Sequence, residues 1–301
     1  MRHRAIVAFL LLVGFVAGYS QYYQQLNNFG GIDWTAQVVR ATGIGAPNPN
    51  LPPGAQRASA IEAAKVVALR NILQIVKGVY VNSETTVENM MLTSDVIRTK
   101  VEGVVRNYRV VDIRYVSTGD VEVDVEVPLS AFYEIFLNVP QQSGASPAPQ
   151  VCPLCGQPWP AGKPYPQNYP VPPPSSPSGA PTPAARPGVV YSGLIIDARG
   201  LGVRPALSPK IVDEMGNEVY GTGNVSREYA VQIGVVGYEK DINRARTNER
   251  VADNPMIVKA LRATGPNRTD VVISNADAQL IRQAAQNLNF LEQCKVMIIL
   301  D

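Results

Sequence analysis

Histidine is almost missing from this chain of 301 residues, which holds only one, His3. It lies in an N-terminal segment that we expect to be removed, so the mature chain would contain no imidazole. That excludes the commonest general base, every Ser-His or Cys-His pair and the commonest zinc ligand. We therefore expect a protein that is not an enzyme and needs no cofactor. A hydrolase using carboxylates alone would need two acids in one cleft, which a sequence does not show.

The sequence near the N-terminus also lacks an apolar run long enough to cross a membrane. Its uncharged, mostly apolar stretch covers residues 5–18 and follows two arginines. A spanning helix needs about 18–20 such residues. Small residues follow the stretch, and the pattern predicts a secretory signal peptide over residues 1–20, cleaved after Gly18 or Ser20, rather than a retained tether.

Cysteine is scarce, with three in the chain, and the first of them is Cys152. None lies near the expected cleavage site, so no thiol there could accept a lipid. We expect a protein that is not lipidated and is periplasmic or associated with the outer membrane. Disulfides persist in such extracytoplasmic spaces.

Charge of one sign is not in excess. The formal net charge of +2 falls to about neutral once the two N-terminal arginines are removed, and no block of like charges remains. Nucleic-acid binding and polybasic membrane patches depend on such blocks. We expect no nucleic-acid partner and at most peripheral membrane contact.

Proline, in contrast, is abundant in one place: residues 140–187 hold 16 of the 25 prolines. Proline fixes φ and has no amide hydrogen, so this segment favours extended polyproline II and coil over a packed core. We interpret it as a disordered, semi-stiff linker of up to about 150 Å at ~3.1 Å per residue. It would join two compact units, residues 32–139 and 188–301.

The first unit shows a pattern of helices on a sheet. We expect a strand over 34–45, and then an amphipathic helix over 57–79 that ends near Gly78. A weaker helix over 88–105 follows. In the hairpin over 108–130, valines alternate with acidic residues, which predicts one buried and one acidic face. A short helix over 130–138 completes a β-α-α-β-β-α order, an α+β fold of helix on antiparallel sheet.

The second unit also predicts an α+β fold of helix on antiparallel sheet, from shorter elements. Strands are expected over 188–200, 227–238, 256–265 and 270–274, with a hairpin around the Gly216–Asn217 turn. A helix is expected over 275–294, capped by Ser274 or Asn275. The last segment, 295–300, is apolar throughout and indicates a strand buried on both faces.

The first unit resembles the family of twenty-kilodalton outer-membrane lipoproteins (Lpp-twenty type) and the related N-terminal domain of flagellar assembly protein T. The resemblance covers residues 33–130 and rests on the strand VVRATGIG, the alanine-rich helix, the GVYV after it and the valine-alternating hairpin. It implies an extracytoplasmic, non-enzymatic role in the envelope or in flagellar assembly, and it implies no catalytic residues. The chain departs from the lipoproteins in having no cysteine to acylate after its signal.

Cys152 and Cys155 form a Cys-x-x-Cys inside the proline-rich segment. A structural zinc site takes four Cys or His ligands, and the mature chain offers three cysteines. Cys294 follows the last helix, where we expect it to behave as a small apolar residue. We expect Cys152 and Cys155 to form a local disulfide or an inert turn; metal binding shared between chains and redox chemistry remain alternatives.

Two further patterns could carry chemistry. The glycine-rich stretch 197–205 could cradle a phosphate only if a helix followed it, and prolines favour a loop. Paired acids occur at Asp213–Glu214 and along residues 121–127, where a turn and a solvated strand face are the simpler interpretations.

These features together predict a secreted, non-enzymatic scaffold for binding or assembly in the cell envelope. Outer-membrane assembly and flagellar assembly are the two processes to which we expect it to be linked. Its expected partners are envelope or flagellar-basal-body proteins, or a second copy of the chain. The alternative is a thiol/disulfide or zinc-binding protein centred on Cys152 and Cys155.

Overall fold

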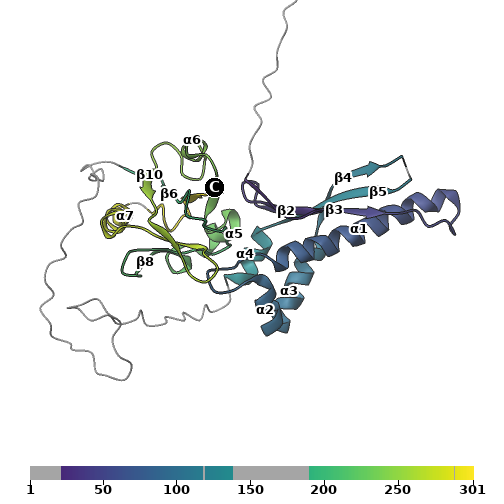
Figure 1. Cartoon of the computed structure of the whole chain (residues 1–301), viewed down its shortest axis with the longest axis horizontal. Helices are drawn as coiled ribbons and strands as arrows, with labels where there is room; N and C mark the ends of the chain where they lie inside the picture. The colour runs from purple at the N-terminus through teal and green to yellow at the C-terminus, as the bar shows by residue number, and fades with distance from the viewer. Residues whose placement is uncertain (1–21, 118, 138–189, 288) are drawn as a thin grey trace, which may run out of the picture.

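The computed structural model describes residues 22–117, 119–137, 190–287 and 289–301. The expected signal peptide, and the proline-rich segment with Cys152 and Cys155, lie outside the described residues. The described chain forms two units that contact each other (Figure 1). Both mix helices with sheets, which confirms the α+β class.

The first unit is a five-stranded antiparallel sheet in the order β1-β2-β3-β5-β4. Its first strand begins nine residues before the expected start at 32, because β1 and β2 form a hairpin that pairs with β3 through β2. The hairpin expected over 108–130 is confirmed as β4 and β5. The elements are β1 (Tyr23–Asn27), β2 (Gly30–Asp33), β3 (Val38–Gly45), α1 (Pro53–Lys77), α2 (Val87–Thr93), α3 (Asp95–Arg106), β4 (Arg109–Tyr115), β5 (Val121–Pro128) and α4 (Ser130–Phe136).

Small residues let α1 lie directly on β3. A Cβ added to Gly43 would lie 2.1 Å from the carbonyl oxygen of Ala64, and one added to Gly45 would lie 2.1 Å from that of Ala60. The facing alanines, including Ala68, are fully buried. Since any larger side chain would push the helix backbone away, the glycines of the strand and the alanines of the helix are matched.

The helix expected over 88–105 is two helices, α2 and α3, separated by Ser94. Ser94 has an extended backbone, and its Oγ accepts a hydrogen bond from the amide of Ile97 at 3.3 Å. Thr86 caps α2 in the same way, through the amide of Asn89. A serine that caps a new helix competes with continuation of the old one, which explains the break.

The second unit departs from the expected antiparallel sheet. Its central sheet, β10-β6-β13-β9, is parallel throughout, and the other, β11-β12-β7-β8, is mixed. The last strand is buried at every position, as its apolar run predicts. The elements are β6 (Leu194–Asp197), β7 (Ile211–Val212), β8 (Glu218–Tyr220), η1 (Thr222–Asn224), α5 (Arg227–Ile233), β9 (Gly237–Glu239), α6 (Ile242–Arg246), β10 (Met256–Lys259), β11 (Arg262–Thr264), β12 (Asp270–Val272), α7 (Asn275–Asn287) and β13 (Val296–Ile299).

Two of the strands expected in this unit are wrong. Residues 227–233 form α5, which ends at Gly234 with φ +80°, and only the last residues of the expected strand enter β9. The stretch 256–265 divides between the two sheets, because the amide of Ala260 bonds to Asp197 while that of Leu261 bonds to Val272. The expected cap of α7 is confirmed, since Ser274 Oγ accepts from the amide of Asp277 at 3.0 Å.

Backbone hydrogen bonds and aromatic rings join the two units. Trp34 of the first unit meets the ring of Tyr238 of the second edge-on, with centroids 5.2 Å apart, and both are buried. One apolar core runs through the two units. Among the described residues, three backbone hydrogen bonds cross between them: Leu207 N to Tyr80 O at 2.9 Å, Ser208 N to Val81 O at 2.7 Å and Asn267 N to Ser83 O at 3.0 Å. The Arg204 guanidinium also donates to Tyr80 Oη at 2.7 Å.

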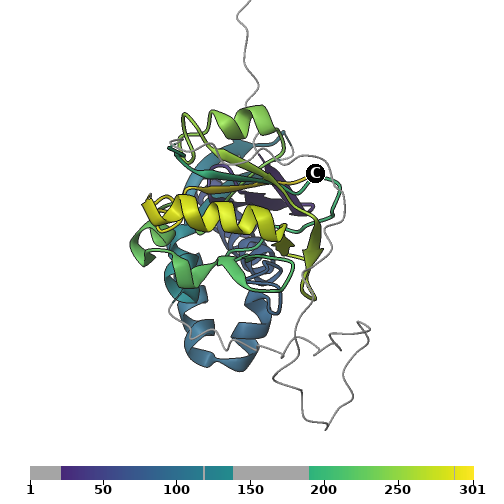
Figure 2. The same cartoon turned by 90° about the vertical axis from the view of Figure 1, so that its left-hand side faces the viewer.

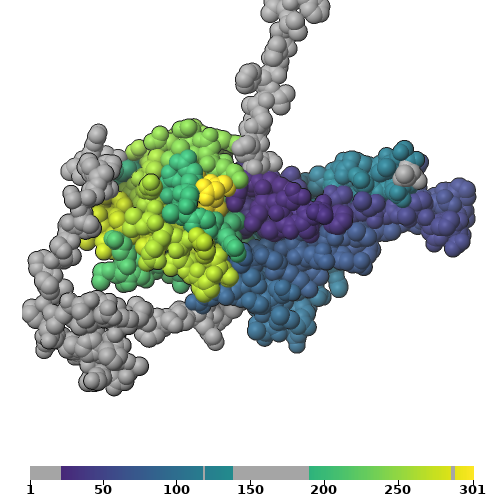
Figure 3. All heavy atoms as spheres, in the orientation of Figure 1, coloured from purple at the N-terminus to yellow at the C-terminus, as the bar shows by residue number. Residues whose placement is uncertain are grey.

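This junction leaves most of the first unit projecting outward. Figure 3 shows the purple and blue surface of the first unit extending away from the green and yellow second unit. Seen from the second unit's side, α7 crosses in front (Figure 2). We call β3, β4, β5 and α1 the arm. Its strand β4 and the start of α1 lie toward the end remote from the second unit (Figure 1).

Candidate interaction surface

The described cysteine is buried and unreactive in character. Cys294 has no exposed surface, and burial raises its pKa to about 11. A thiol rather than a thiolate is then present at neutral pH, which confirms its expected role as a small apolar residue. Cys152 and Cys155 lie outside the described residues, so their disulfide or metal role stays a prediction. The described residues hold no group of three or more potential metal ligands.

The glycine-rich stretch is a turn. Gly200 and Gly202 both have positive φ, and no helix follows among the described residues up to 210. Arg199 and Asp197 form an ordinary ion pair at 2.6 Å, which lowers the pKa of the Asp197 carboxyl. The loop interpretation is therefore confirmed over the phosphate cradle.

The acid pair at 213–214 also has a structural role. Asp213 Oδ1 accepts the turn amides of Met215 and Asn217 at 3.0 and 2.8 Å. Glu214 accepts the amide of Asn275 at the start of α7 at 2.9 Å. These bonds use the carboxylates to satisfy backbone donors, as the turn interpretation expects.

The acids of β5 lie on the face of the sheet opposite α1 and are ion-paired there. The sequence predicts an acidic face, but not the arginines that neutralise it. Arg114 of β4 contacts Asp124 and lies 3.1 Å from Glu122. Other pairs on this face join Arg114 to Asp112 at 3.0 Å, Arg40 to Glu126 at 3.2 Å and to Asp33 at 3.9 Å, and Arg109 to Glu126.

Arg114 is the centre of this network. Its guanidinium reaches Asp124, Asp112 and Glu122, and these bonds raise its own pKa above the usual range. The same contact, with a hydrogen bond from Thr42 Oγ1 at 2.6 Å, lowers the pKa of Asp124. Cross-strand pairs of this kind fix the register of β4 on β5.

Strand β4 itself is the most exposed strand of the arm. It ends the order of the sheet and pairs with β5 on one side only. Six of its seven residues are exposed, including Val111, Ile113 and Tyr115 at 50%, 37% and 58%. An edge strand with β-branched and aromatic side chains is a ready template for another strand. The buried face expected from the alternating valines is confirmed on β5, where all four valines are buried, whereas β4 leaves its apolar side chains largely exposed.

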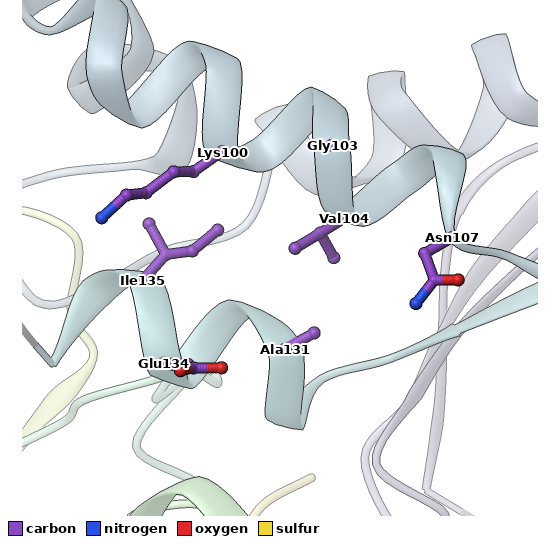
Figure 4. A pocket seen from close by; sticks show the side chains of 7 residues that line it. All are labelled: Lys100, Gly103, Val104, Asn107, Ala131, Glu134 and Ile135. Carbon is purple, nitrogen blue, oxygen red and sulfur yellow. The ribbon is translucent and has the colours of Figure 1, made fainter.

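A hollow of about 470 Å³ lies between α3 and α4 (Figure 4). Lys100 and Val104 line it from α3, and Glu134 and Ile135 from α4. A Cβ added to Gly103 at its edge would meet nothing within 4 Å. The lining is mixed, with one lysine and one glutamate beside apolar and amide side chains.

Among the described residues, the helices are too short or too polar to span a bilayer. No curated protein matches the chain. Family models match two separate parts of it. Residues 193–301 match the second domain of Treponema pallidum Tp0624, and residues 41–128 match the LPP20 lipoprotein family. The resemblance stated for the first unit is thus confirmed: this part of the chain is similar to the LPP20 lipoproteins, which indicates an envelope-associated protein.

Proposed function

We propose that the protein is a non-enzymatic scaffold of the cell envelope, whose arm presents the edge of β4 to a partner. Three observations support this. The first unit is similar to an envelope lipoprotein family. The junction through Trp34 and Tyr238 makes one body of the two units. The observation that carries the proposal is the exposed edge of β4 at the projecting arm.

The chemistry of the edge favours binding over catalysis. A free strand edge offers main-chain donors and acceptors in a row, and side chains on alternate positions give specificity. The acidic side chains of β4 and β5 are engaged in ion pairs with arginines, as those of Glu122 with Arg114 and of Glu126 with Arg109 illustrate. These ion pairs therefore stabilise the pairing of β4 with β5, and the free edge of β4 makes the contact with the partner.

Site-specific cross-linking in cells tests the proposal. A photo-reactive amino acid replaces Tyr115 on the β4 strand, and the control places it at Val66, which is 58% exposed on α1. We expect Tyr115 to give cross-links whose partners mass spectrometry identifies as envelope proteins, and Val66 to give few. Equal yields at both positions, or none at Tyr115, would rule out β4 as the contact surface.

The thiol interpretation is tested in the same cells. Cys152 and Cys155 lie outside the described units, and we expect localisation and the Tyr115 cross-links to persist when both are replaced by serine. Loss of the cross-links with both units still folded would favour the thiol or zinc function instead. Fractionation and the intact mass of the exported chain test the extracytoplasmic location and the absence of a lipid.

A further inference from the structure

We propose that β4 pairs with β4 of a second copy of this chain, in antiparallel orientation, about a two-fold axis at Ile113. The inference rests on the proposed scaffold function and names the chemical nature of its partner. The two five-stranded sheets would become one continuous sheet, with an arm projecting on each side.

The register with β5 shows which side chains of β4 share a face. Ile113 lies opposite Val123, which is fully buried under α1. Asp112 lies opposite Asp124, on the ion-paired face. Residues directly opposite in an antiparallel pair point to the same side. The edge therefore alternates an apolar side toward α1 and a charged side away from it.

The outward hydrogen-bonding groups of β4 include those of Ile113. Its amide donates to Asp112 Oδ1 at 2.9 Å, in place of a β5 carbonyl. In an antiparallel ladder every second residue turns its N–H and C=O away from the existing partner. Ile113 and Tyr115 thus offer their main chain to a new strand, and the Asp112 carboxylate that covers this amide is released when the strand arrives.

Charge complementarity selects the register. An axis at Ile113 places Asp112 opposite Arg114 of the second copy, twice, and Val111 opposite Tyr115. Moving the axis to Asp112 or to Arg114 would place like charges directly opposite, which is destabilising. The strand sequence, Arg-Val-Val-Asp-Ile-Arg-Tyr, is therefore self-complementary in one register.

Two features bear on the strength of the pairing. Arg57 lies over the Tyr115 ring, 5.0 Å from its centroid, and holds the ring beside α1 before any contact forms. The β-bulge between Val110 and Asp112 limits regular pairing to a few residues. An interface this short falls below the ~1,200 Å² of stable complexes, so we expect a weak, concentration-dependent dimer.

Sedimentation velocity of the full purified chain over a concentration series tests the proposal. We expect a monomer–dimer equilibrium. Ile113→Lys brings two ammonium groups together at the axis and should weaken the dimer at least tenfold. Val66→Lys adds the same charge to another exposed apolar position and should leave the dimer unchanged. Circular dichroism and thermal unfolding of both variants check that they fold.

A second measurement reports the register without a disruptive substitution. Single spin labels are placed along β4, in a background in which Cys152 and Cys155 are serine. The distance between copies should be shortest at Ile113 and should grow toward both ends of the strand. Similar distances at every position would indicate parallel pairing and overturn the proposal.

A chain that stays monomeric throughout the series, or a dimer that Ile113→Lys leaves intact, would also overturn self-pairing. Neither result removes the scaffold function, provided that Tyr115 still cross-links to a different envelope protein in cells. Loss of all cross-links from Tyr115 would instead remove the proposed function itself.

Discussion

The two strands that flank β5 lie in opposite surroundings. On one side, β3 is covered by α1 at backbone contact, through Gly43, Gly45 and the buried alanines of the helix. On the other side, β4 is exposed at nearly every position and pairs with β5 alone among the described strands. The contact between β3 and α1 thus has no room for an added atom, whereas the free edge of β4 has room for a whole strand. The close packing on β3 stabilises the fold, and the edge of β4 remains available for a partner.

The largest expected effect on stability comes from disrupting the packing of α1 on β3. Gly43→Ala places a Cβ 2.1 Å from the Ala64 carbonyl oxygen and 2.3 Å from the Ala68 amide, so α1 must move. We expect the free energy of unfolding to fall by about 4 kcal/mol or more, the exceptional range for one substitution. Urea unfolding measures it.

Gly103→Ala on α3 is the matched control, because its Cβ would meet nothing within 4 Å. The same substitution should there raise the free energy of unfolding by roughly 0.5–1 kcal/mol, through helix propensity. Equal effects at the two glycines would contradict the close packing of α1 on β3.

The next largest effect concerns the junction between the two units. Trp34→Ala removes a buried ring from the junction with Tyr238, and we expect a loss of about 3 kcal/mol. The two units should then unfold in separate transitions, followed by scanning calorimetry and circular dichroism. Leu92→Ala, at a side chain that is 70% exposed on α2, serves as the control and should change little. Coincident transitions in Trp34→Ala would show that the junction does not depend on this ring.

The first unit was largely predictable from its sequence, because its main patterns are local. Apolar spacing along 57–79 gives α1, and the valine alternation gives β5, because each pattern depends on neighbours in the chain. The break at Ser94 was missed, since a capping serine and a tolerated one look alike within a helical pattern. The sequence analysis also missed that β1 and β2 form a hairpin and that β2 pairs with β3.

The second unit was predicted less well, because its short segments depend on tertiary partners. Residues 227–233 hold the β-formers Tyr229, Val231 and Ile233 at alternate positions yet form a helix, and 256–265 divides between two sheets. The parallel sheet follows from how distant strands meet, which periodicity does not encode. For the candidate surface, the sequence predicted that β4 is a strand. Its exposure was not predicted, because exposure depends on which strand ends the sheet.

The smallest expected effect on stability comes from the ion pairs of β4. Arg114→Met removes the cation shared by Asp112, Glu122 and Asp124. Arg114 is 44% exposed, so solvent screens these pairs and we expect a loss under about 1 kcal/mol at neutral pH.

The pH dependence separates this network from simple packing. Arg114 lowers the pKa of Asp124 below 3.8, so the folded state binds that proton less readily than the unfolded state does. The resulting stability is present above about pH 3.8 and is lost as the pH falls through the folded pKa. Arg114→Met should therefore unfold with a shallower acid dependence, measured by urea titration at several pH values. A loss of 3–5 kcal/mol, the size found for buried pairs, would mean that the β4 face is covered rather than open.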